Sequence, residues 1–150
     1  MEQSGAADYQ AQLDALVERV LDYYKLQRPP VPIERMLAHP IEGLQQVDMT
    51  DLSLVFGIGE HRYEYRMAMG RLLYREVCRQ GPSGWAAQEY PYSTEAARYF
   101  ASVLLVPTPW LLKAVRRPLI NVATLSETYQ VPDYVIATRV TQIGKRVRGM

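Results

Sequence analysis

Apolar residues recur at steps of three and four near the start of the chain, which predicts an amphipathic helix over residues 8–27. Its buried stripe consists of Leu13, Leu16, Val17, Val20, Leu21 and Tyr24. The helix must end before the segment RPPVP at residues 28–32, because proline lacks a backbone N–H and forces its predecessor into an extended conformation. Pro32 can then open a short second helix over residues 33–38.

The apolar pattern changes between residues 41 and 65. Residues 54–58 (LVFGI) and 62–65 (RYEY) alternate as strands do, and the intervening Gly59, Glu60 and His61 can form a turn. These two segments predict a small antiparallel β-sheet.

Helical spacing returns after the predicted sheet. The pattern predicts helices over residues 66–79, 94–105, 110–115, 120–129 and 133–143, and Ser93 is the expected N-cap of the second of these. Together the elements predict one mostly helical α+β domain over residues 8–145, with a helical C-terminal part. Residues 1–7 are expected to be disordered, and residues 146–150 are expected to form a flexible tail.

Composition narrows the class of protein. Seventeen Lys and Arg against sixteen Asp and Glu give a formal charge of +1, so no overall field favours nucleic acid or an anionic membrane. The single Cys78 excludes an internal disulfide and favours a reducing compartment. No segment has the roughly 20 apolar residues of a membrane span, and the first residues, MEQS, lack the basic and apolar parts of a secretory signal. We therefore expect a cytoplasmic protein that does not contact membranes.

Two segments carry a family resemblance. Residues 62–74 read RYEYRMAMGRLLY, and residues 97–107 read ARYFASVLLVP. The first is similar to R-F-T-x-A-H-E-L-G-H-L-L and the second to A-N-x-F-A-x-x-L-L-M-P, which are motifs of the ImmA/IrrE family of zinc metallo-endopeptidases that cleave repressor proteins. The resemblance covers most of residues 8–145 and implies a zincin-like, ImmA/IrrE metallopeptidase-like core.

The departures from the family motif decide what function the resemblance implies. In H-E-x-x-H, two histidines four residues apart share one helix face and hold zinc, while the glutamate acts as general base. The aligned positions here are Met67, Ala68 and Arg71, which supply neither imidazole nor carboxylate. The family's third ligand aligns nearest to Thr94, with Glu95 one residue away. The resemblance therefore implies a degenerate site with no catalytic residue, no bound metal and no cofactor.

The family's cleft would be lined in this chain by Met67, Arg71, Arg75 and Glu95, which we expect to be binding residues. One hypothesis pairs the guanidinium of Arg71 with the carboxylate of Glu95, in the place of the metal. The alternative is that Arg71 points to solvent and that Glu95 only complements the dipole of its own helix.

Two further features of this region stay open. Arg71, Arg75 and Arg79 recur every four residues, so they form a stripe that could bind an acidic peptide or phosphate, or could simply be solvated. The loop that follows holds Trp85, Tyr90 and Tyr92, which would form a peptide-binding lip if exposed and an anchor for the loop if buried.

We therefore expect a regulatory or adaptor protein that binds a protein partner, such as a repressor-like regulator, through the former substrate cleft. One alternative is an active zinc peptidase whose ligands are relocated among His39, His61, Glu76, Cys78 and Glu95. The other is a regulator whose last two helices form a helix-turn-helix and contact nucleic acid through Tyr134, Thr138, Thr141, Gln142, Lys145 and Arg146.

Overall fold

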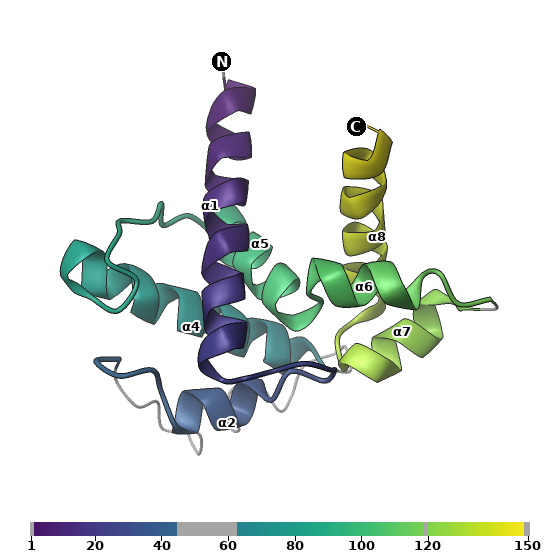
Figure 1. Ribbon diagram of the computed structural model, residues 1–150, viewed down its shortest axis with the longest axis horizontal. Helices are drawn as coiled ribbons and strands as arrows, with labels where there is room; N and C mark the ends of the chain where they lie inside the picture. Colours follow the sequence, from purple (N-terminus) through teal and green to yellow (C-terminus); the bar gives the residue numbers. More distant parts are fainter. Residues whose placement is uncertain (1, 45–62, 119, 149–150) are drawn as a thin grey trace.

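A computed structural model describes residues 2–44, 63–118 and 120–148 of the chain. These ranges are built from helices joined by short connections (Figure 1). The helices are α1 (Glu2–Tyr23), α2 (Ile33–Ala38), α4 (Glu64–Gln80), the 3-10 helix η1 (Gly81–Ser83), α5 (Thr94–Leu105), α6 (Thr108–Ala114), α7 (Val122–Tyr129) and α8 (Asp133–Arg148).

The predicted α+β class is wrong, because the described ranges contain no β-strand and no sheet. The first predicted strand, residues 54–58, lies outside the described residues. The second, residues 62–65, falls where α4 begins: Tyr63 has a left-handed φ of 71°, and Glu64 is the first helical residue. Alternation over four residues fits a first helical turn as well as a strand, and here the strong helical pattern that follows extends back to Glu64.

Several other predicted elements are confirmed. Helix α5 has the predicted bounds, and the Ser93 side chain accepts the Ala96 N–H at 3.0 Å as the expected N-cap. Helix α2 also has the predicted bounds, although Pro32 stands at its N-cap rather than at its first position. Helix α1 begins at Glu2 and ends at Tyr23, so its start precedes the predicted one at residue 8.

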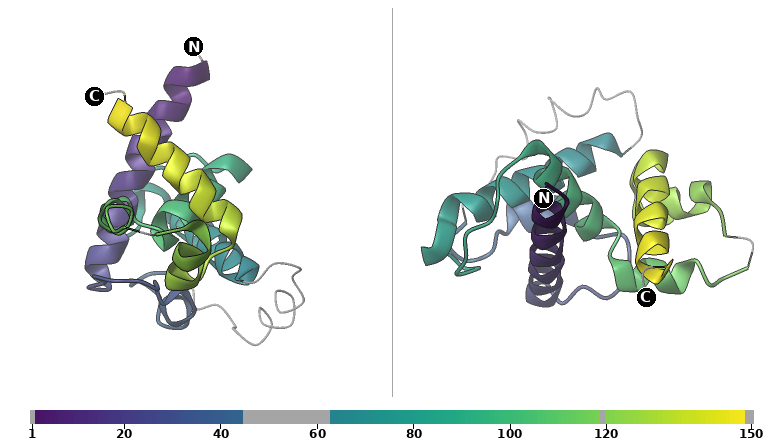
Figure 2. Two further views of the ribbon diagram at one scale, coloured as in Figure 1. Left: turned by 90° about the vertical axis from the view of Figure 1, so that its right-hand side faces the viewer. Right: turned by 90° about the horizontal axis from the view of Figure 1, so that it is seen from above.

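Helices α4 and α5 form the centre of the molecule. Helix α1 packs on α5, α2 packs on α4, and α8 contacts α5, α6 and α7. Seen from above, α1 and α8 lie on different sides of α5 (Figure 2). The central pair packs tightly at Gly70, where a Cβ atom would lie 2.8 Å from the Cβ of Ala101. Only glycine at this position allows the two helix backbones to come so close.

A buried arginine connects α4 to two distant segments. Arg66 is 2% exposed, and its guanidinium forms bonds of 2.9 and 3.0 Å with both carboxylate oxygens of Glu34 in α2. It also donates to the carbonyl of Val31, and its Nε donates to the carbonyl of Gln130 at 2.9 Å. Gln130 lies in the turn between α7 and α8, so one side chain holds that turn to the centre of the molecule.

A second buried arginine does the same for α8. Arg139 is 1% exposed, and its Nε donates to the carbonyl of Val106 at 3.0 Å. Its terminal nitrogens donate to the hydroxyl of Thr108 and to the side-chain oxygen of Gln142. Helix α8 is therefore fixed to the turn between α5 and α6.

Candidate binding cleft

An open cleft of about 600 Å³ lies between α4, α5 and α8. Each of the three helices presents residues three or four apart, so one face of each helix forms a wall. The lining residues are Glu64, Met67 and Arg71 of α4, Thr94, Arg98 and Ser102 of α5, and Tyr134, Val135 and Thr138 of α8.

The floor of the cleft is apolar. Met67 is 3% exposed and Val135 is 2% exposed, so both belong to the core and to the cleft at once. The hydroxyl of Ser102 is also buried and donates to the carbonyl of Tyr99 at 2.9 Å within its own helix. An apolar floor beneath a polar rim is the usual arrangement of a binding pocket.

Tyr134 of α8 and Glu64 of α4 form a hydrogen bond in the cleft. The Tyr134 hydroxyl lies 2.7 Å from both carboxylate oxygens of Glu64 and donates to them. Burial, followed by this hydrogen bond and the charge of Glu64, raises the pKa of Tyr134 to about 12, although Arg71 and Arg98 act in the opposite direction. Tyr134 is therefore a neutral hydrogen-bond donor at neutral pH, and it joins α8 to α4.

The cleft contains two guanidinium groups, those of Arg71 and Arg98. Arg71 is half-buried and Arg98 is exposed, and neither forms an ion pair with another residue in the described ranges. The hypothesised pair with Glu95 is thus not formed. Glu95 is exposed in the first turn of α5, where its charge complements the helix dipole, and it does not line the cleft.

The predicted arginine stripe divides into two parts. Arg71 lines the cleft, whereas Arg75 and Arg79 both approach Glu76, at 3.7 and 3.3 Å. Glu76 is buried, whereas the side chains of Arg75 and Arg79 are exposed. The buried carboxylate therefore has two cationic neighbours that reach it from the protein surface. Of the expected binding residues, the structure therefore brings Met67 and Arg71 into the cleft and leaves Arg75 and Glu95 outside it. Ala68, the position of the family's general base, is buried and is also not a lining residue.

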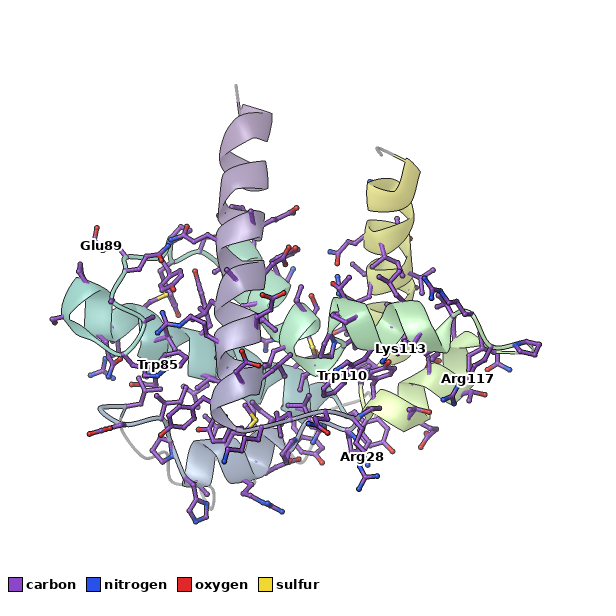
Figure 3. The ribbon with its side chains drawn as sticks, in the orientation of Figure 1. Arg28, Trp85, Glu89, Trp110, Lys113 and Arg117 are labelled. Carbon is purple, nitrogen blue, oxygen red and sulfur yellow. The ribbon has the colours of Figure 1, made fainter. Side chains whose placement is uncertain are left out.

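The loop aromatics lie away from the cleft. Trp85 packs beneath the guanidinium of Arg19, whose carbon lies 4.7 Å from the ring centroid, and Figure 3 places Trp85 on the opposite side of α1 from α8. Tyr90 is half-buried, while Tyr92 is 61% exposed and stacks on Tyr74. These contacts anchor the loop to the rest of the fold.

Zinc does not fit the residues at the family's metal positions. A thioether, a methyl group and a guanidinium, from Met67, Ala68 and Arg71, offer no ligand set for this ion. Across residues 2–44, 63–118 and 120–148, no group of three or more His, Cys, Asp or Glu side chains could hold a metal. Of the relocated ligands considered above, His39 is exposed on α2's C-terminal end, and His61 lies outside the described residues.

The structure adds residues that sequence reasoning missed. Arg98 and Ser102 lie four and eight residues after Thr94, so helical spacing from Thr94 could have found them. Tyr134 and Thr138, which the alternative nucleic-acid hypothesis named, form the α8 wall of the cleft. Thr141 and Lys145 are exposed on α8, Gln142 accepts from Arg139, and the Arg146 side chain is outside the described set. Glu64 was assigned to a strand, and no signal placed it in the cleft.

Comparisons with known proteins do not assign this cleft to a family. No family model, no curated protein and no solved structure matches the chain. In the described ranges, none of the helices combines the length and the apolar character that crossing a lipid bilayer requires.

Proposed function

We propose that this chain is a cytoplasmic, non-catalytic relative of the ImmA/IrrE zinc metallo-endopeptidases that acts as a regulatory or adaptor protein. It binds a protein partner, such as a repressor-like regulator, through the α4–α5–α8 cleft. One observation carries the proposal: Met67, Arg71 and Thr94, which align with the family's three ligand positions, all line the same cleft. Met67 and Arg71 come from α4 and Thr94 comes from α5, and Thr94 is more than twenty residues after Arg71 in the sequence.

The side chains in the cleft support binding without hydrolysis. The general-base position is the methyl group of Ala68, and the carboxylate in the cleft, Glu64, is held by Tyr134. A bound peptide would therefore meet hydrogen-bond donors, two cations and an apolar floor, but no group placed to activate a water molecule by the family's mechanism.

Site-specific crosslinking tests the binding role. A photo-crosslinking amino acid placed at Thr138, in the cleft, should yield a discrete adduct with one cellular protein after irradiation of the native host. The same amino acid at Lys113, which is exposed on α6 and outside the cleft, serves as the control. The partner identified from Thr138 should then bind the purified chain in a calorimetric titration. The absence of a Thr138 adduct, or the same adducts from both positions, would contradict the proposal.

Metal content separates this proposal from a peptidase with relocated ligands. Protein purified without chelator should contain far less than one zinc per chain by elemental analysis, and it should leave an unfolded protein substrate intact. Near-stoichiometric zinc together with hydrolysis that a chelator abolishes would show an active enzyme instead.

A further inference from the structure

The charge of the cleft points to the chemistry of its partner. On α4, the other arginines with described contacts are engaged: Arg66 with Glu34 at 2.9 Å, and Arg75 and Arg79 with Glu76. Arg71 has no such ion pair in the described part of the chain, and neither has Arg98 on the facing helix α5. Two cations thus line one cleft, and no described carboxylate forms an ion pair with either of them.

Glu64, the carboxylate that lines the cleft, forms no ion pair with Arg71 or Arg98 among the described residues. Both oxygens of Glu64 accept the Tyr134 hydroxyl at 2.7 Å. Arg71 of α4 and Arg98 of α5 line the same cleft, and both lower the pKa of the Tyr134 hydroxyl. An incoming carboxylate that binds between these two arginines, away from the charge of Glu64, would meet guanidinium donors from two helices, and a guanidinium can form two hydrogen bonds with a carboxylate.

The floor of the cleft distinguishes a peptide from a small inorganic anion. Met67 and Val135 line the cleft and present a small apolar area beside the cations, since they are 3% and 2% exposed, and the volume of about 600 Å³ greatly exceeds that of a single phosphate. Methionine is flexible and polarisable, so Met67 can adapt to different apolar side chains. Thr94 and Thr138 add hydroxyl groups at the rim, which can bond to an extended backbone.

We propose that Arg71 and Arg98 form a carboxylate clamp, which selects a partner segment with an Asp or Glu next to an apolar residue that packs on Met67 and Val135. This inference rests on the proposed function, because it names the chemistry that the partner must present to the same cleft. The clamp would explain why one cation, Arg71, stands at a position where the family has a metal ligand: a positive charge is retained there for recognition, without the means to cleave.

Peptide selection tests the clamp. A random nine-residue peptide library displayed on phage is selected against the folded wild-type chain, and the enriched peptides are synthesised with a fluorescent label. We expect the enriched sequences to share an acidic residue beside an apolar one. Arg71→Gln and Arg98→Gln should each weaken binding of these peptides about tenfold or more, as expected when a charged hydrogen bond is lost.

A matched control removes the same charge elsewhere. Arg35→Gln combined with Arg116→Gln deletes two exposed cations outside the cleft and should leave peptide affinity at the wild-type value. Circular dichroism and thermal unfolding of all variants check that they are folded. Replacing the acidic residue of a selected peptide by Asn or Gln should reproduce the loss caused by the arginine variants, and the two losses should not add.

The outcomes separate the clamp from the broader function. Peptides that bind in the cleft without a shared acidic residue, or that bind Arg71→Gln/Arg98→Gln as tightly as wild type, would overturn the clamp while the cleft remains a protein-binding site. Inorganic phosphate or a 20-base-pair DNA duplex that competes with the peptides at lower concentration than free glutamate would also overturn it, in favour of a phosphate site. If no peptide is enriched and Thr138 yields no crosslinked partner, both proposals fail.

Discussion

Tyr134 shows how one residue can be both a structural and a recognition element. It is 48% exposed, yet its hydroxyl is held by both oxygens of Glu64. The bond joins α8 to α4 at the mouth of the cleft, which Arg71 and Arg98 also line. The raised pKa of Tyr134 follows mainly from burial of its hydroxyl, and the hydrogen bond with Glu64 and the charge of Glu64 add to it, because deprotonation would place two negative charges side by side.

The pH dependence of stability should report this bond. The pKa of Tyr134 is raised to about 12 in the folded chain, whereas an unfolded tyrosine titrates near about 10. Between these values the folded chain keeps a proton that the unfolded chain has lost, so the stability contributed by Tyr134 is present below about pH 10 and declines as pH rises toward 12. Urea unfolding from about pH 8 to 11 should therefore show a shallower decline for Tyr134→Phe than for wild type.

The difference in slope between the two proteins should correspond to the release of well below one proton on unfolding, because the half-exposed side chain is screened by solvent. Glu64→Gln keeps the phenol but removes the neighbouring charge, so it should change the slope in the same direction. Equal slopes for wild type and Tyr134→Phe would show that the bond has no influence on stability.

At the scale of elements, the contact of α4 with α5 determines the width of the cleft. Gly70 immediately precedes Arg71, and its missing side chain allows Ala101 of α5 to lie directly against the α4 backbone. Any larger residue would move the two helices apart, and with them the walls that carry Arg71 and Arg98.

Gly70→Ala should accordingly destabilise the fold. Alanine favours a helix by about 1 kcal/mol relative to glycine, but its Cβ would lie 2.8 Å from that of Ala101, and overpacking of this kind costs about 1–3 kcal/mol. We expect a net loss in the free energy of unfolding, measured with urea. Ala101→Gly in the same chain should recover part of the loss, so that the two changes are not additive. Additive effects in this double-mutant cycle would mean that the helices do not meet as described.

Periodicity predicted most helices well because their apolar residues repeat over many turns. Helices α2 and α5 follow from prolines and an N-cap serine that act locally, and these signals do not depend on the tertiary fold. The predicted strand at residues 62–65 failed for the opposite reason: four alternating residues are too few to distinguish the first turn of α4 from an extended segment.

At the scale of the whole molecule, the cleft depends on contacts that no local pattern contains. The sequence suggested Met67 and Arg71 through the motif, but it could not show that α8 forms the third wall. That wall is set by Arg66 and Arg139, which reach carbonyl groups at Gln130 and Val106. Arginines are usually assigned to the surface from sequence, so their buried positions, and the residues of α8 that they place, were not predictable.

Removing the first of these arginines should weaken the entire fold. Arg66→Leu leaves the carboxylate of Glu34 and the carbonyls of Val31 and Gln130 without their donor, and breaking a buried ion pair in this way costs about 3–5 kcal/mol. Because Glu34 is 38% exposed at its side chain, we expect a loss near about 3 kcal/mol in urea unfolding. Arg35→Leu removes an exposed arginine from the neighbouring helix and should change stability by less than about 0.5 kcal/mol. Similar losses in the free energy of unfolding for Arg66→Leu and Arg35→Leu would show that the buried contacts of Arg66 do not contribute to stability.

The two buried arginines, Arg66 and Arg139, should also affect the affinity of the cleft for a ligand. Because Arg66 and Arg139 fasten both ends of the α8 wall to the central helices, the recess is preorganised before anything enters it. The walls of the cleft then lose little conformational entropy when a ligand binds, and this smaller entropic cost increases the affinity. Encounter should accordingly resemble the docking of a flexible strand onto a rigid surface, with the ordering confined to the incoming chain.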